Sequence, residues 1–206
     1  FNYTDFHAKW YKVMPDDPIL YKQRAVWTFR LEGKTDNARK IIDKASKWNP
    51  DHDYYYYPLQ SFDKYDHKYD QVLKYLNNSE DSVKYYQNFI DLKFLSLSEI
   101  YRLMGKKDQS KKEAQKALDQ LLGLPDIDKD SRYHKMLGWI YVYLYEPQKA
   151  IQEAQKAMEL YPSQKDKFTS DEYEINLAYI YAITGEHKIA LDMIDKLMSK
   201  PSNINW

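Results

Sequence analysis

The sequence predicts an all-α fold built from pairs of helices that follow one another along the chain. The composition is the first observation: the 206 residues include five Val and five Thr, whereas Lys, Leu, Ala and Glu are plentiful, and this balance favours helices over strands. A recurring pattern of small, aromatic and Gly residues is the second, because self-similarity at a period of roughly 20 to 50 residues is typical of repeat architectures.

Composition also narrows the classes of function. The 31 basic and 31 acidic residues give no net charge, which argues against a dedicated binder of nucleic acid. The chain has no Cys, so it can hold neither disulfides nor thiolate metal sites, and a cytoplasmic location is favoured. No apolar run reaches the length of about 18 residues that spans a membrane. No basic and then apolar leader follows Phe1, so we expect no secretory signal and interpret the chain as a fragment of a longer protein.

The first element that the sequence predicts is a single helix within residues 1–14. Its apolar residues fall on one helical stripe at Tyr3, Phe6, Trp10 and Val13, the pattern of a helix with one buried face. A turn rich in Pro and Asp at 14–18 separates it from the next helix. We interpret this helix as the second half of an incomplete pair.

Four helix pairs with the same internal spacing are predicted next. In each pair, the first helix carries two adjacent small or apolar residues and then an aromatic residue, a turn residue follows, and the second helix carries three more small or apolar residues. In the first pair these are Ala25-Val26 and Phe29, then Gly33 at the turn, then Ala38, Ile42 and Ala45. Small residues let two helices cross closely, and Gly at the turn takes a left-handed conformation without steric cost. The turn positions are Gly33, Gly105, Tyr145 and Gly185. The pairs lie near 19–50, 91–123, 131–162 and 171–202.

A fifth, degenerate pair is predicted near 53–84. His67 stands where the other pairs have a turn Gly, and Asp63 replaces the aromatic residue. Pro58 falls inside its first helix, where Pro removes a backbone hydrogen bond and clashes with the preceding turn. We therefore expect this helix to begin at or after Pro58, or to be kinked there.

The spacing resembles that of the tetratricopeptide repeat, W-x2-L-G-x2-Y followed by A-x3-F, A and P. The pair near 131–162 shows it, with His134 in the place of Trp and then Leu137-Gly138, Tyr141, Ala150, Ala154, Ala157 and Pro162. The resemblance implies one repeat domain over 1–206, a right-handed α-solenoid of about five hairpins plus an N-terminal half repeat. Residues 177–206 also resemble the C-terminal repeat regions of multidomain bacterial regulators.

The resemblance implies a concave groove, lined by the first helix of each pair, that binds a peptide or a segment of a partner protein. Aromatic and Arg residues are typical of binding hot spots, and such a groove would suit apolar anchors with some acidic character. One subclass of the family captures a C-terminal carboxylate with Lys and Asn, but here Trp139 stands in one of the Asn places, so the full clamp is not expected. The alternative is that the Trp and Tyr residues pack as core. Helical spacing predicts these groove residues: Trp27, Arg30, Tyr54, Tyr57, Arg102, Lys135, Trp139, Asn176 and Tyr179.

The four consecutive Tyr residues at 54–57 leave a second function open. They could form a stacking platform for a sugar or a base, as in a small-ligand or glycan sensing domain of a larger bacterial regulatory protein. The alternative is that they pack between repeats and keep their hydroxyl groups in water.

No catalytic set, cofactor or metal site is predicted, so we expect a non-catalytic interaction scaffold. Gly33-Lys34-Thr35 lacks both the upstream Gly and the preceding strand of a phosphate-binding loop. Asp126, Asp128 and Asp130 lack the Gly and the closing Glu of a calcium loop, and we interpret them as a cap for the helix that begins near Ser131.

The last predicted helix, 188–199, is apolar over more than one stripe, and residues such as Leu191 and Met198 have no predicted cover. Repeat arrays need a polar cap at each end. We expect a further helix, an adjoining domain or a second copy of the chain to cover this end.

Overall fold

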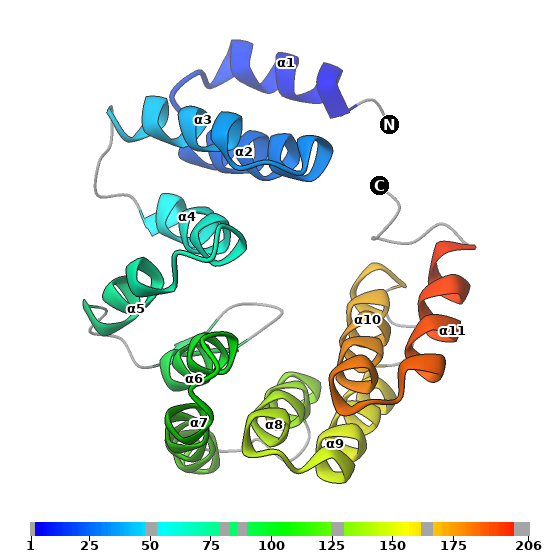
Figure 1. The fold of residues 1–206 in the computed structure, drawn as a ribbon. Coiled ribbons are helices and arrows are strands. Elements are labelled where there is room, and N and C mark those ends of the chain that lie inside the picture. Colours follow the sequence, from blue (N-terminus) through cyan, green and yellow to red (C-terminus); the bar gives the residue numbers. More distant parts are fainter. Residues whose placement is uncertain are drawn as a thin grey trace. The chain divides into compact units, whose positions relative to one another are not determined.

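The structure is a computed structural model, which describes residues 3–47, 53–78, 83–85, 90–124, 130–161 and 167–199. These residues form eleven helices and one short antiparallel ribbon (Figure 1). They fall into two compact units, residues 1–77 and residues 78–206. The predicted all-α repeat fold is confirmed, and within the described residues the ribbon is an addition to it.

Helices α1 to α5 make up the first unit. They run Tyr3–Val13, Pro18–Glu32, Asp36–Ser46, Asp53–Tyr65 and Tyr69–Asn78. The Asp17 carboxylate caps α2 by accepting from the Ile19 backbone N–H at 2.8 Å, and Gly33 ends that helix with a left-handed φ of 62°. The core lies between α2, α3 and α4 and contains Tyr21, Ala25, Ala38, Ile42, Ala45 and Phe62.

Helix α4 begins at Asp53, so the expected start at or after Pro58 is wrong, whereas the alternative of a kink at Pro58 stays a prediction. The Pro58 ring takes away the N–H that would bond the backbone carbonyl four residues earlier. The ring itself is fully buried, and this burial of apolar surface offsets part of that loss.

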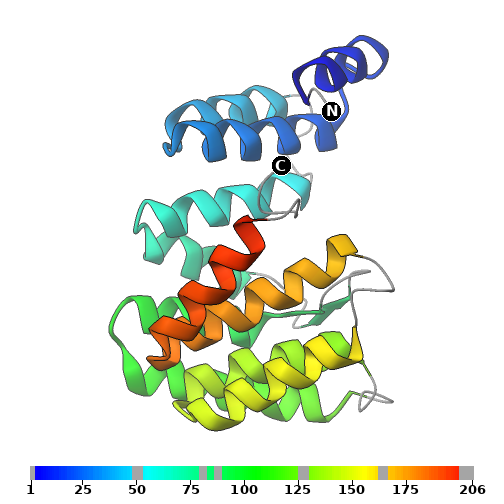
Figure 2. The ribbon, with the colours of Figure 1, turned by 90° about the vertical axis from the view of Figure 1, so that its right-hand side faces the viewer.

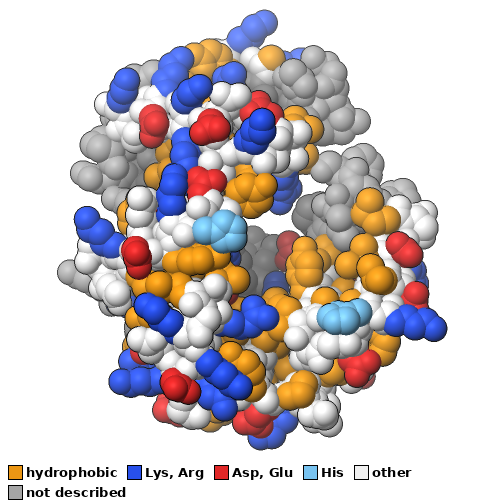
Figure 3. Space-filling model, in the orientation of Figure 1, with side chains coloured by type: hydrophobic (Ala, Val, Ile, Leu, Met, Phe, Trp, Pro, Cys, Tyr) orange, Lys and Arg blue, Asp and Glu red, His pale blue; other side chains and the backbone are white. Residues whose placement is uncertain are grey.

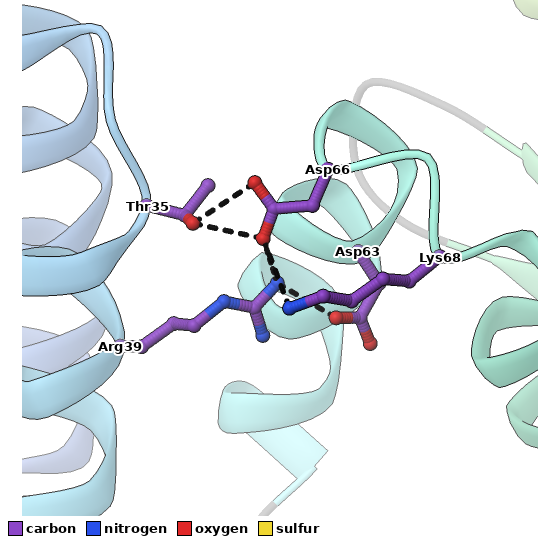
Figure 4. Close-up of polar contacts among 5 residues, drawn as sticks. All are labelled: Thr35, Arg39, Asp63, Asp66 and Lys68. Atoms are coloured by element: carbon purple, nitrogen blue, oxygen red, sulfur yellow. Dashed lines mark hydrogen bonds and ion pairs between the residues drawn. The ribbon is translucent and has the colours of Figure 1, made fainter.

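A partly buried ionic network joins α3 to the end of α4 (Figure 4). Nη2 of Arg39 donates to the Asp63 carboxylate at 2.7 Å and to the Asp66 carboxylate at 2.8 Å. The Thr35 hydroxyl donates to both Asp66 oxygens, at 3.0 and 2.9 Å, and Lys68 approaches Asp66 at 3.3 Å. Only 1% of the Asp63 side chain is exposed. Asp63 therefore fills the place of the missing aromatic residue as a buried charge paired with Arg39.

This network makes the stability of the first unit sensitive to acid. Burial raises the pKa of Asp66, but the hydrogen bonds from Thr35, Arg39 and Lys68 outweigh it and hold that pKa below its ordinary value of 3.8. The unfolded chain therefore binds the proton more readily, so the stabilisation is present above about pH 4 and is lost as the pH falls through the lower, folded-state pKa. We expect urea unfolding to show this loss below about pH 4, and Asp66→Asn to flatten it; an equal pH slope in the variant would contradict the assignment.

The second unit begins with the ribbon and continues with three helix pairs. Strands β1 (Val83–Tyr85) and β2 (Ile90–Leu92) pair antiparallel, with Lys84 opposite Asp91. Two three-residue strands are too short to show the alternation by which a sequence reveals a strand, so they were not predicted. Helices α6 to α11 run Lys93–Leu103, Lys107–Leu122, Ser131–Leu144, Pro147–Leu160, Lys167–Thr184 and His187–Met198.

The pairs of the second unit stack in sequence order. The first helix of the middle pair, α8, contacts both α6 and α10, whereas each second helix packs on the first helix of the next pair, α7 on α8 and α9 on α10. Figure 1 shows α6, α8 and α10 along one side of this stack, and Figure 2 shows the same helices from the side. Each pair thereby buries its apolar stripe against a neighbour.

The predicted turns are confirmed by their backbone conformation. Gly105 and Gly185 have φ angles of 74° and 99°, in the left-handed region. His67 and Tyr145 adopt the same conformation, with φ angles of 58° and 63°, although a Cβ atom makes that conformation cost about 1–2 kcal/mol. The repeat spacing therefore located these two turns without the help of a Gly.

Candidate functional site

Two of the predicted groove residues meet directly between α8 and α10. Nε1 of Trp139 donates a hydrogen bond to Oδ1 of Asn176 at 2.5 Å. The indole ring also stacks on Tyr143, with ring centroids 6.0 Å apart and planes inclined by 27°. Trp139 is therefore held on both sides, and it remains half-buried.

The hydrogen bond from Trp139 fixes the orientation of the Asn176 amide. An indole N–H can only donate, so the atom facing it is the amide oxygen. The amide nitrogen Nδ2 then has no hydrogen-bond partner among the described residues, although the Asn176 side chain is buried, with 5% of the residue exposed. A buried amide without a hydrogen-bond partner destabilises the folded state by about 1–3 kcal/mol. An acceptor supplied by a bound molecule would remove this cost.

Lys135 lies one helical turn before Trp139 on α8. Its ammonium sits 5.5 Å from the centroid of the Tyr173 ring, which belongs to α10. Burial lowers the pKa of Lys135 below the ordinary value of 10.5, and the nearby Glu172 carboxylate opposes that shift. Within the part of the chain that the structure describes, no carboxylate forms an ion pair with Lys135. It is thus a second donor without an acceptor of opposite charge.

The surface continues from α8 onto α6 through Tyr143. Burial raises the pKa of the Tyr143 hydroxyl well above its ordinary value; Glu99 of α6 adds to this shift and Arg102 of α6 opposes it. Both α6 side chains therefore lie close enough to Tyr143 to act on it electrostatically. Tyr179 continues the surface on α10, three residues after Asn176, with 54% of the residue exposed. We call Arg102, Lys135, Trp139, Asn176 and Tyr179 the inner surface of the second unit.

The other predicted groove residues belong to the first unit. Trp27 is half-buried on α2, and the Arg30 guanidinium lies 5.4 Å from the centroid of its ring. Tyr54 and Tyr57 lie on α4, but their side chains are outside the described residues. The stacking platform predicted for 54–57 therefore stays a prediction, as does a single groove along the whole chain.

Sequence reasoning missed two aromatic residues that complete the inner surface. Tyr143 lies four residues after Trp139 on α8, and Tyr173 lies three residues before Asn176 on α10. Helical spacing of three or four residues places side chains on one face, so this signal was present. Both residues are buried, and each contacts a predicted groove residue: Tyr143 stacks on Trp139, and the Tyr173 ring lies beside the Lys135 ammonium.

The remaining motifs have structural roles where the structure describes them. Gly33 ends a helix, and Asp130 caps α8 by accepting from the Arg132 backbone N–H at 2.9 Å, whereas Asp126 and Asp128 lie outside the described residues. His134 is buried, and its Nδ1 lies 2.6 Å from the Glu153 carboxylate. A search of the described residues for three or more clustered His, Cys, Asp or Glu side chains found no candidate metal site.

Helix α11 exposes apolar side chains. The exposed fractions are 43% for Ile189, 61% for Leu191 and 54% for Met198. That a further helix, an adjoining domain or a second copy covers this end stays a prediction. None of the described helices is long and apolar enough to cross a bilayer.

Comparison with known proteins gives the fold and no family name. A search of family models and a search of curated proteins found no match. Among solved structures, the chain is similar to the Cut9–Hcn1 hetero-tetramer of APC/C, with a TM-score of 0.53 and 15% sequence identity over 93% of this chain. The chain spans about a third of that neighbour's length, since the match covers 35% of it. This likeness, together with the stacked helix pairs, supports a tetratricopeptide-like repeat fold.

Proposed function

We propose that the inner surface of residues 78–206 binds an extended segment of a partner protein, and that the chain serves as a non-catalytic interaction scaffold. The observation that carries this proposal is the Asn176 amide, whose two N–H groups find no acceptor among the residues that the structure describes while Trp139 holds the oxygen. A backbone carbonyl or a carboxylate of the partner would supply that acceptor. Side-chain rotations at an interface are common on binding, so a partner can reach an amide that is covered in the free chain.

Lys135 and the aromatic residues define what the segment should contain. The Lys135 ammonium would gain a charge-assisted hydrogen bond from an acidic group, a stronger contact than a neutral one. Trp139 and the exposed Tyr179 offer flat apolar area that loses little conformational entropy on binding. We therefore expect a segment with an apolar anchor and an acidic or carbonyl oxygen a few residues away.

The double substitution Trp139→Ala and Lys135→Ala is expected to abolish binding while leaving helicity intact. Peptides selected from a random library on the wild-type chain supply the probe, and fluorescence anisotropy measures their affinity. Truncating two hot-spot residues should weaken binding about 100-fold or more. Both residues are only half-buried, so we expect the double variant to keep its helices. Far-UV circular dichroism checks this.

A matched control separates the inner surface from any apolar and basic pair. Leu191→Ala with Lys196→Ala removes the same kinds of side chain from exposed positions of α11 and should leave affinity unchanged. Unchanged affinity in the Trp139 and Lys135 double variant would contradict the proposal. A thermal-shift screen with sugars and nucleotides tests the alternative of a small-ligand sensor, since a ligand that binds the folded state raises its melting temperature.

A further inference from the structure

Four lysines of the second unit gather where α7 begins. Lys106 and Lys107 follow the turn residue Gly105, and Lys111 and Lys112 lie about one helical turn later; all four are exposed. Figure 3 shows several Lys and Arg side chains over α6 and α7, with acidic side chains among them. We call these four residues the basic patch.

Asp108 stands among the four lysines in the first turn of α7, so the basic patch keeps a surplus of positive charge but is not free of carboxylates. Glu113 is paired with Lys116 at 2.8 Å, and Glu146, next to Tyr145 in the chain, is paired with Lys149 at 2.5 Å. Within the described part of the chain, the four patch lysines have no ion pair of their own. Their positive charge is therefore available to a partner.

Aromatic rings hold three of these ammonium groups in place. Lys107 and Lys111 both face the ring of Tyr145, at 4.4 and 5.4 Å from its centroid, and Lys106 lies 6.0 Å from the ring of Tyr101. Tyr145 lies on the neighbouring α8–α9 turn, so the patch bridges two helix pairs. Contacts of this kind restrict where the ammonium groups lie.

Two local energetic costs oppose the arrangement of the patch lysines around Tyr145. Tyr145 adopts a left-handed φ of 63° at a turn where the equivalent residues Gly105 and Gly185 are glycines, and a Cβ atom is unfavourable there. Cations at a helix N-terminus oppose the helix dipole, and lysines at i and i+4, as Lys107 and Lys111 are, repel each other. Real proteins break such local rules mainly at functional sites.

We infer that the basic patch, ordered by Tyr145, is a docking surface for an acidic segment of a partner protein. Carboxylates of Asp or Glu complement the four ammonium groups in charge. Nucleic acid is disfavoured, because the patch has no Arg for bidentate phosphate contacts. An anionic membrane is disfavoured because stable anchoring takes a second, apolar signal besides a basic patch, and Leu103, 39% exposed, is a single aliphatic side chain. The patch shares no residue with the inner surface, so this inference stands or fails apart from the proposed function.

The test measures binding of a fluorescein-labelled peptide of eight Glu residues to the full chain by anisotropy. We expect salt-sensitive binding that a Gln peptide of equal length does not show. Replacing all four patch lysines with Gln should weaken it about tenfold or more, since each removes one charge contact. The matched control replaces Lys149, Lys156, Lys188 and Lys196, also exposed, and should change affinity less than threefold. Equal losses in the two variants would overturn the inference, because the effect would then come from net charge alone.

Two further readouts separate docking from a stabilising role of the lysines and test the class of partner. If the lysines serve stability, the patch variant will melt at a lower temperature; if they serve docking, its melting temperature will stay the same or rise, because repulsion is relieved. Tyr145→Gly keeps the left-handed turn but removes the ring that orders Lys107 and Lys111. We expect it to weaken binding of the Glu peptide severalfold without lowering the melting temperature. Tighter binding of a 20-base-pair DNA duplex, or of vesicles containing phosphatidylserine, than of the Glu peptide would overturn the choice of partner.

Discussion

Replacing Arg39 with Met is expected to lower the free energy of unfolding of the first unit by about 3–5 kcal/mol. The Arg39 guanidinium is the shared partner of Asp63 and Asp66, and Asp63 is almost completely buried. Without Arg39, the Asp63 carboxylate keeps its desolvation cost and loses its counter-charge. The Met side chain fills much of the same space, so the loss measures the charge and not a cavity.

Chemical denaturation and hydrogen exchange together locate the effect. Denaturation gives the change in free energy, and exchange of the backbone amides in α3 and α4 shows whether protection is lost there. The double variant Arg39→Met with Asp63→Leu is the control, because removing the buried charge should recover most of the stability. A loss below about 1 kcal/mol for Arg39→Met would place this pair with exposed ion pairs, which contribute little.

The network also shows a limit of sequence reasoning. Asp63 was recognised as a departure from the repeat pattern, but its partner lies 24 residues earlier in the chain, and no local signal connects the two. The start of α4 at Asp53 has a similar cause. Pro58 discourages a helix locally, while burial of its ring depends on the neighbouring helices.

The turns were predictable because their constraint is local. A left-handed residue must end the first helix of each pair, and Gly meets that need at the lowest cost. Once Gly33, Gly105 and Gly185 set the register, the repeat spacing identified His67 and Tyr145 as well, although residues other than Gly adopt that conformation uncommonly.

The site was predictable as a set of residues but not as an arrangement. Helical spacing and repeat register placed Trp139 and Asn176 on facing helices, although 37 residues separate them. The roles that matter for binding depend on tertiary packing: the indole N–H orients the Asn176 amide, and the Tyr173 ring lies beside the Lys135 ammonium. A sequence states which side chains share a face, whereas hydrogen-bond direction follows only from the packed structure.

Replacing Gly138 with Leu is expected to lower the free energy of unfolding of the second unit by about 3 kcal/mol. Gly138 lies in α8 where that helix meets both α9 and α10. A Cβ atom placed there would lie 3.0 Å from Cδ1 of Ile180 and 3.3 Å from the backbone carbonyl oxygen of Ala150. The backbone of α9 cannot move aside without disturbing the Ala150 and Ala154 contacts at the heart of the core. A Leu side chain would therefore force the helices apart.

Gly138→Ala separates close packing from helix propensity. Ala is favoured over Gly within a helix by about 1 kcal/mol. Its methyl group would need a small shift of the flexible end of Ile180 and would also press on the backbone carbonyl oxygen of Ala150, 3.3 Å away. These effects oppose each other, so Gly138→Ala should change the free energy of unfolding by less than about 1 kcal/mol. Urea denaturation of the three chains checks both values. If Leu were tolerated as well as Ala, α8 and α9 would not cross as closely as this stack requires, and the inner surface that α8 carries would lose the rigid support on which the binding proposal depends.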